Sequence, residues 1–232
     1  MYILGYNIQL NLMVNRQFIL LVILPLLFCS EQEKVHEISE NSEAILQPQL
    51  IDYQKQDSLR KIAFLNDLEI DYLDGKSIDF YLDHPATKEI VKEFYRGDFF
   101  PSDNDKTFEL LKVLFEEQKE IHPFYFHCMN SIIRYSDGAL SEALGGPAQK
   151  MIYNYPDYAF SYFEDHDEIF DEYIGLIGYE MYFQKNGTSS IKMPQKDFFS
   201  YLEHNLDLQD LQTKALFTRF VDGINAVQNE LD

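Results

Sequence analysis

Tryptophan is absent from this chain of 232 residues, and cysteine occurs only twice, at Cys29 and Cys128. Two cysteines are too few for a disulfide-stabilised scaffold, in which several bridges compensate for a small core. The composition is instead 46% hydrophobic and 15% aromatic. We therefore expect a globular protein whose stability comes from an apolar core, with Cys128 as one of its small buried residues.

Basic residues are also scarce. Lysine and arginine total 19 against 39 aspartates and glutamates, which gives a formal net charge of −20. Nucleic-acid binding needs a basic face for the phosphates, so we expect no nucleic-acid partner. Anionic lipid headgroups would also repel so acidic a domain. The charge has two interpretations that remain open here: it keeps the protein soluble, or it recognises a basic protein partner.

The common catalytic and cofactor-binding motifs are missing as well. The chain has no Gly-x-Ser-x-Gly, His-Glu-x-x-His, Cys-x-x-Cys or Gly-x-Gly-x-x-Gly sequence. Catalytic groups can be distant in sequence, so missing motifs do not by themselves exclude an enzyme. We expect no cofactor and no metal ion, and we favour a non-enzymatic protein.

A short apolar segment near the N-terminus is the most specific feature that is present. Arg16 supplies a positive charge, Phe18 to Phe28 is a continuous apolar run, and Cys29 is followed by the polar stretch Ser30 to Lys34. This run is shorter than the roughly 20 residues that a membrane-spanning helix needs. A short apolar run that ends at a cysteine resembles the signal of bacterial lipoproteins, and Leu26 fits the leucine usual three positions before that cysteine.

The resemblance implies that residues 1–28 form a signal peptide, with Met13 as an alternative start, and that Cys29 is lipidated. The protein would then be a membrane-anchored lipoprotein of the bacterial cell envelope, in the outer membrane or at the surface. Three alternatives stay open: an uncleaved membrane anchor, cleavage after Ser30, and a core helix. Without a lipid on Cys29, a disulfide between Cys29 and Cys128 also becomes possible in an oxidising compartment.

Downstream of the anchor, residues 29–49 are polar and rich in glutamate, so we interpret them as a flexible tether. Helical signals fill residues 50–232. Helices are expected from Asp57 or Ser58 to Asp74-Gly75, between Pro85 and Gly97, after Ser102 to Asp105, from His122-Pro123 to Tyr135, from Asp137 to Gly145-Gly146-Pro147, from Ala148 to Tyr155, after Asp165, from Pro194 to Asn205, and from about Asp207 onward.

The apolar positions expected to face the core follow helical spacing in each segment. Examples are Leu59, Ile62, Ala63, Leu65 and Leu68 in the first helix, and Phe170, Tyr173, Ile174, Ile177 and Met181 in the helix after Asp165. No stretch shows sustained strand-like alternation. We therefore predict a single all-α domain, either a multi-helix bundle or a short helical-hairpin array, with roughly seven to nine helices.

Two surface features are candidates for partner binding. Glu164, Glu168 and Glu172 are spaced four apart in the densest acidic cluster, and we expect them to share a helix face. Tyr155 and Tyr158 belong to an aromatic run around Pro156, which forms either a binding surface or part of the core.

The leading hypothesis is a lipid-anchored helical module that binds another macromolecule, such as a basic protein that it inhibits. The rival is an envelope enzyme with carboxylate-based hydrolytic chemistry, which would use the Glu164–Glu172 cluster together with His166.

Overall fold

The computed structural model describes the backbone of residues 42–116, 118–187 and 195–232, with side chains from Lys55 onward. The chain divides into two units, Met1–Pro48 and Gln49–Asp232. Of the first unit, the described residues are 42–48, which form the first turns of a helix. The predicted signal segment and Cys29 lie outside the described residues.

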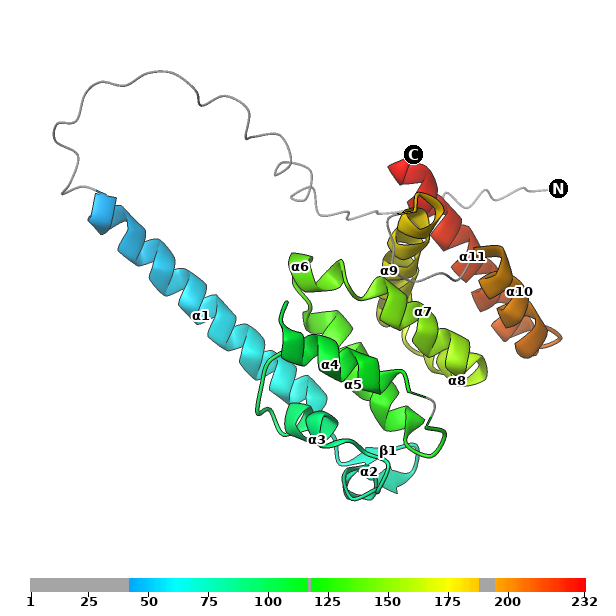
Figure 1. Cartoon of the computed structure of the whole chain (residues 1–232), viewed down its shortest axis with the longest axis horizontal. Helices are drawn as coiled ribbons and strands as arrows, with labels where there is room; N and C mark the ends of the chain where they lie inside the picture. Colours follow the sequence, from blue (N-terminus) through cyan, green and yellow to red (C-terminus); the bar gives the residue numbers. More distant parts are fainter. Residues whose placement is uncertain (1–41, 117, 188–194) are drawn as a thin grey trace, which may run out of the picture. The chain divides into compact units, whose positions relative to one another are not determined.

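The described residues form eleven α-helices and one two-stranded β-hairpin, so the predicted all-α class is confirmed (Figure 1). Nine of these helices have seven residues or more, and α2 and α6 are shorter. The elements are α1 (Ser42–Leu68), β1 (Tyr72–Leu73), β2 (Lys76–Ser77), α2 (Ile78–Leu82), α3 (Glu89–Tyr95), α4 (Asp105–Leu114), α5 (His122–Tyr135), α6 (Gly138–Ser141), α7 (Gly145–Asn154), α8 (Pro156–Phe163), α9 (Asp167–Lys185), α10 (Gln195–Asn205) and α11 (Leu211–Leu231).

Three helices begin at a polar capping side chain. Asn104, Asp137 and Asp210 each accept a hydrogen bond from the backbone N–H three residues later, at 2.9, 3.1 and 2.7 Å. These bonds satisfy N–H groups of the first turn that have no partner inside the helix. The starts of α4 and α6 therefore lie where the sequence predicted them. The predicted break at Gly145 to Pro147 is instead the first turn of α7, where proline is tolerated because first-turn N–H groups need no intrahelical acceptor.

The first predicted helix ends earlier than expected. Helix α1 stops at Leu68, and Asp74-Gly75, predicted as its end, is the turn of the β1–β2 hairpin. Asp74 and Gly75 both have positive φ, at 49° and 73°, which is the backbone of a type I′ turn and is typical of Asp-Gly in two-residue hairpins. At its other end, α1 begins at Ser42, inside the segment predicted to be a polar tether.

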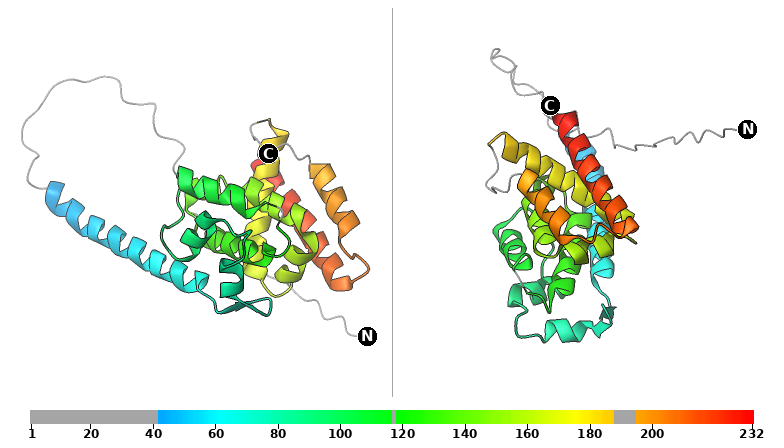
Figure 2. Two further views of the ribbon diagram at one scale, coloured as in Figure 1. Left: turned by 60° about the horizontal axis from the view of Figure 1, so that its bottom comes forward. Right: turned by 90° about the vertical axis from the view of Figure 1, so that its right-hand side faces the viewer.

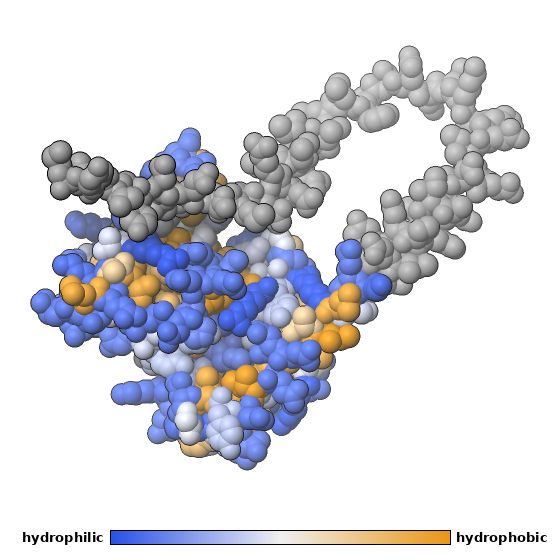
Figure 3. All heavy atoms as spheres, turned by 180° about the vertical axis from the view of Figure 1, so that it is seen from behind, coloured by the Kyte–Doolittle hydropathy of each residue, from blue (hydrophilic) through white to orange (hydrophobic). Residues whose placement is uncertain are grey.

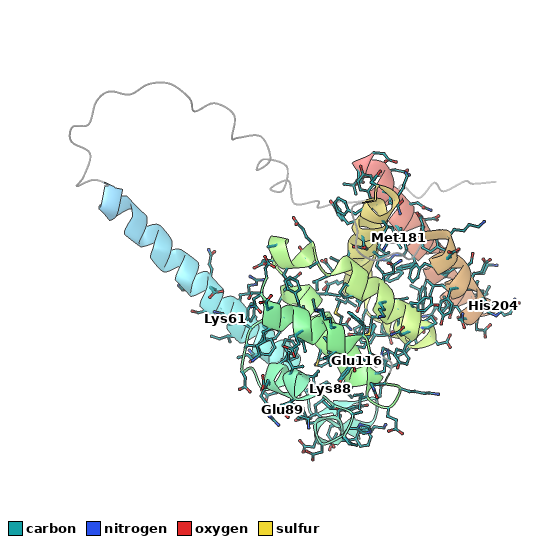
Figure 4. The ribbon with its side chains drawn as sticks, in the orientation of Figure 1. Lys61, Lys88, Glu89, Glu116, Met181 and His204 are labelled. Carbon is teal, nitrogen blue, oxygen red and sulfur yellow. The ribbon has the colours of Figure 1, made fainter. Side chains whose placement is uncertain are left out.

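One core unites α1's last turns with α2 through α11, and aromatic rings dominate it. Cys128 is fully buried there, as predicted. The predicted stripe of α9 is also confirmed as buried, including Met181, which Figure 4 labels. The largest fully buried side chains are Tyr81, Tyr125, Tyr173, Phe64, Phe94, Phe124, Phe126, Phe160, Phe163, Phe170, Phe198 and Phe220.

Helix α9 is the central element of the C-terminal half, because it packs extensively on both α7 and α11 (Figure 1, Figure 2). Glycines make both approaches close. A Cβ atom at Gly145 of α7 would lie 2.6 Å from the Leu176 carbonyl oxygen, and one at Gly178 would lie 2.8 Å from Val227 of α11. Helix α9 is therefore held firmly on two sides, and it leaves one stripe to solvent.

The predicted inward face of α1 is largely wrong. Leu59, Ile62 and Leu65 are exposed, by 56%, 55% and 41%, whereas Phe64 and Leu68 are buried. Only the last turns of α1 contribute buried residues to the core, and Leu59 and Ile62 upstream of them stay more than half exposed. Apolar atoms accordingly interrupt the hydrophilic surface along this helix (Figure 3). None of the helices within the described ranges combines the length and the apolar character needed to cross a bilayer.

Candidate functional site

The three predicted glutamates are all exposed, but they do not all lie on one helix face. Glu168 and Glu172 belong to α9 and share a face at i and i+4. Glu164 follows the last residue of α8, and α9 begins only after His166, whose non-helical backbone, with φ −135° and ψ 61°, separates the two helices. The expectation of a shared face is therefore wrong for Glu164, because the boundary between α8 and α9 falls between Glu164 and Glu168.

Two aspartates of the acidic cluster form ion pairs with an arginine of another helix. Arg219 of α11 reaches Asp167 at 2.5 Å and Asp171 at 2.6 Å, one turn apart on α9. Its guanidinium also lies 5.0 Å from the centroid of the Phe170 ring. These two aspartates therefore form ion pairs with α11 at the protein surface, whereas no ion pair is seen for Glu168 or Glu172 among the described residues.

The carboxyl group of Glu172 has a pKa above its ordinary value. Partial desolvation of its carboxyl group raises the pKa of Glu172, and the negative charge of the adjacent Asp171 raises it further. The side chain nevertheless remains exposed as a whole. A carboxylate that is partly desolvated gains more from a cationic partner than one that is fully hydrated.

The solvent-exposed face of α9 continues well beyond the glutamates. Glu168, Glu172, Gly175, Tyr179 and Phe183 fall within about 80° of the helix circumference, at 100° per residue. We call these five residues the α9 stripe. Tyr179 is 51% exposed and Phe183 is 46% exposed. The stripe thus joins an acidic end to an aromatic end, opposite the buried face of the same helix.

Tyr179 and Phe183 were not among the predicted site residues. The signal was present, because both fall at helical spacing from Glu172 on the side away from the apolar positions of α9. Exposed aromatic side chains in line on one helix are a common feature of interaction surfaces, whereas isolated exposed apolar residues are normal.

Gly175 lies in the middle of the α9 stripe, and the fold gives no packing reason for it. A Cβ atom at Gly175 would have no atom of the described residues within 4 Å, in contrast to Gly178, where Val227 blocks the space. Glycine inside a helix costs about 1 kcal/mol relative to alanine. The α9 stripe therefore contains a helix-weakening residue that leaves an open position between Glu172 and Tyr179.

The two predicted tyrosines are elsewhere and have a packing role. Tyr155 stacks on His122 with ring centroids 3.5 Å apart, and Tyr158 meets the same imidazole edge-on at 5.1 Å. Burial raises the pKa of the Tyr158 hydroxyl, and so does its hydrogen bond with the Asp74 carboxylate of the hairpin turn. Both rings are half-buried between α8 and α5, so they are not part of the α9 stripe.

His122 itself is buried and neutral. Its Nε2 atom has no hydrogen-bond partner within the described ranges, and burial lowers its pKa to about 3. Without access to solvent, the imidazole is not placed to exchange protons with a substrate. It instead completes the aromatic packing between α5 and α8.

The Cys128 thiol and two further histidines are similarly held within the fold. Burial raises the pKa of the Cys128 thiol, and the neighbouring His127 donates from Nε2 to the Leu68 carbonyl at 2.9 Å. His166 donates from Nδ1 to the Tyr162 carbonyl at 2.7 Å, and its ring stacks on that of Tyr162. Across the residues that the structure describes, no three His, Cys, Asp or Glu side chains converge as metal ligands would.

Comparison of the chain with protein-family models, with curated proteins and with solved structures found no match.

Proposed function

We propose that this protein is a lipid-anchored, non-enzymatic binding module of the bacterial envelope, and that it recognises a basic protein. The observation that carries the binding proposal is the α9 stripe, where Glu168 and Glu172 lie exposed in line with Tyr179 and Phe183. Glu164, just before α9, adds a third exposed carboxylate at the acidic end.

The charge of the whole chain favours a basic partner over other macromolecules. With a net charge of −20, the protein attracts cations over several ångströms and repels nucleic acid. Such a field accelerates encounter with a basic protein, and local contacts then fix the orientation. The exposed aromatic rings next to the carboxylates would supply those contacts, since charge alone gives little specificity.

Substitution of the glutamates tests the binding proposal. The full chain with Glu164, Glu168 and Glu172 changed to Gln serves as bait against an envelope extract, beside the wild type. The matched control changes Glu109, Glu203 and Glu230 to Gln, which removes the same charge from exposed positions on α4, α10 and α11.

We expect a basic protein that the wild type and the control retain and that the triple variant at the α9 stripe loses. We also expect its association rate to fall steeply with added salt, because exposed charges are screened beyond about 8 Å at physiological ionic strength. Equal retention by both triple variants would mean that the acidic cluster has no part in recognition.

The anchor needs its own test, because Cys29 is outside the described residues. A Cys29→Ser chain, expressed with labelled fatty acid, should lose the label and leave the membrane fraction or accumulate as a precursor. A wild-type chain that carries no label would contradict the lipoprotein proposal.

The rival enzymatic function rests on one observation, the raised pKa of Glu172, since perturbed carboxyl groups occur often at active sites. It predicts that Glu172→Gln alone abolishes turnover of an envelope substrate, whereas the binding proposal predicts only a partial loss of affinity.

A further inference from the structure

We infer that the partner presents a basic amphipathic α-helix, which docks along the α9 stripe and seats a large apolar side chain over Gly175. This inference rests on the proposed function and narrows it, because it specifies the shape of the basic partner as well as its charge.

The spacing of the α9 stripe is the first reason. Its residues follow one another at intervals of four, three, four and four, which is the pattern of a helix face that packs against a second helix. From Glu168 to Phe183 the stripe extends about 22 Å at 1.5 Å per residue, which corresponds to about four turns of a docked helix.

Gly175 is the second reason. In helix packing, a side chain of one helix enters the space between side chains of the other. The missing side chain at Gly175 leaves such a space between Glu172 and Tyr179, and no atom of the described residues fills it. Gly145 and Gly178, by contrast, are explained by the close contacts that they make within the fold.

Charge determines which kind of helix fits. The first turns of the α9 stripe carry Glu168 and Glu172, with Glu164 beside them, whereas the later turns carry Tyr179 and Phe183. The partner helix should therefore place lysine or arginine at one end of its contact face and aliphatic residues at the other. Two copies of this chain, each with a net charge of −20, would repel each other, so we assign the face to a different, basic protein.

Two synthetic peptides of identical composition separate helix docking from charge attraction. The first has leucine and lysine at heptad spacing, so that it forms an amphipathic basic helix of about four turns. The second is a scrambled isomer with the same charge and no apolar face. The affinity of each labelled peptide for the full chain is measured by fluorescence anisotropy.

Two variants of the α9 stripe are compared with matched controls. Gly175→Leu fills the open position, and Ser200→Leu adds the same side chain at an exposed site on α10. Tyr179→Ala removes an exposed ring, and Tyr72→Ala removes one that is 72% exposed on the hairpin. Thermal unfolding by circular dichroism confirms that each variant is folded.

We expect the amphipathic peptide to bind more tightly than its isomer. Gly175→Leu and Tyr179→Ala should each weaken it about tenfold or more, as expected for central contact residues, while the two controls leave it unchanged. If both peptides bind equally and depend only on the glutamates, the helix inference is wrong and the proposed function stands. If neither variant changes the affinity of the amphipathic peptide, the peptide docks elsewhere and the inference is likewise wrong. If neither peptide binds, the helix inference is wrong, and capture of a basic protein from the envelope extract decides the proposed function separately.

Discussion

The same substitution, three residues apart on α9, should have opposite effects on stability. Gly175→Ala should stabilise the protein, because a Cβ atom there meets open space among the described residues. Gly178→Ala should not, because its Cβ atom would lie 2.8 Å from both Cβ and Cγ1 of Val227. These atoms are close to the α11 backbone, so they cannot move away as freely as the end of a long side chain.

The expected magnitudes follow from two opposing effects. Alanine is favoured over glycine in a helix by about 1 kcal/mol, which applies at both positions. Overpacking costs typically about 1–3 kcal/mol, which applies only at Gly178. Gly175→Ala should therefore raise the free energy of unfolding by about 1 kcal/mol, and Gly178→Ala should change it by between about 0 and −2 kcal/mol. The two melting temperatures should differ by roughly 2 to 12 °C.

Urea and thermal unfolding of the full chain measure both changes. A double variant, Gly178→Ala with Val227→Ala, removes the clashing Cγ atoms and should recover part of the loss, beyond the sum of the single effects. If Gly178→Ala stabilised the protein as much as Gly175→Ala, the close approach of α9 to α11 would be refuted. Gly175 would then no longer differ from Gly178 in the space around it.

Three further outcomes are expected. Burial holds the pKa of His122 near 3 in the folded protein, against about 6.5 when unfolded, so the stability should fall as the pH drops below about 6.5. His122→Phe should make that fall shallower, as measured by urea midpoints at about pH 7 and pH 5. The buried Cys128 thiol should react with a thiol reagent only after unfolding, and Cys128→Ala should cost about 1 kcal/mol; rapid labelling of the folded chain would contradict this. Asp210→Ala should lower the melting temperature of the protein, because it removes the side-chain cap of α11, with Asp210→Asn close to wild type.

Local chemistry explains which parts of the fold could be predicted from the sequence. The caps at Asn104 and Asp137 act within a few residues, so the chain itself reveals them. The buried face of α9 was equally predictable, because its apolar residues from Phe170 to Met181 recur at helical spacing and all lie in the core. The fold class follows from many such segments together, and it was correct.

The predictions were wrong where the environment of a residue depends on segments that are distant in the sequence. Leu59 and Ile62 have the spacing of core positions, but the core ends before it reaches them. Glu164 has the correct spacing from Glu168, but a helix boundary falls between them. Gly175 and Gly178 look alike in sequence, and only the position of α11 gives them different roles. The candidate site was therefore half predictable: its acidic end was anticipated, and its aromatic end was missed.

The open space beside Gly175 also bears on how this sequence can change over time. At positions 145, 178 and 223, the neighbouring helices forbid a larger side chain, so natural variants should keep very small residues there. At position 175 no atom of the described residues meets an added Cβ, so a change to alanine there should stabilise the protein. If lineages that carry this chain nevertheless retain glycine at 175, the restraint comes from outside the molecule, as the proposed docking of a partner helix over Gly175 predicts.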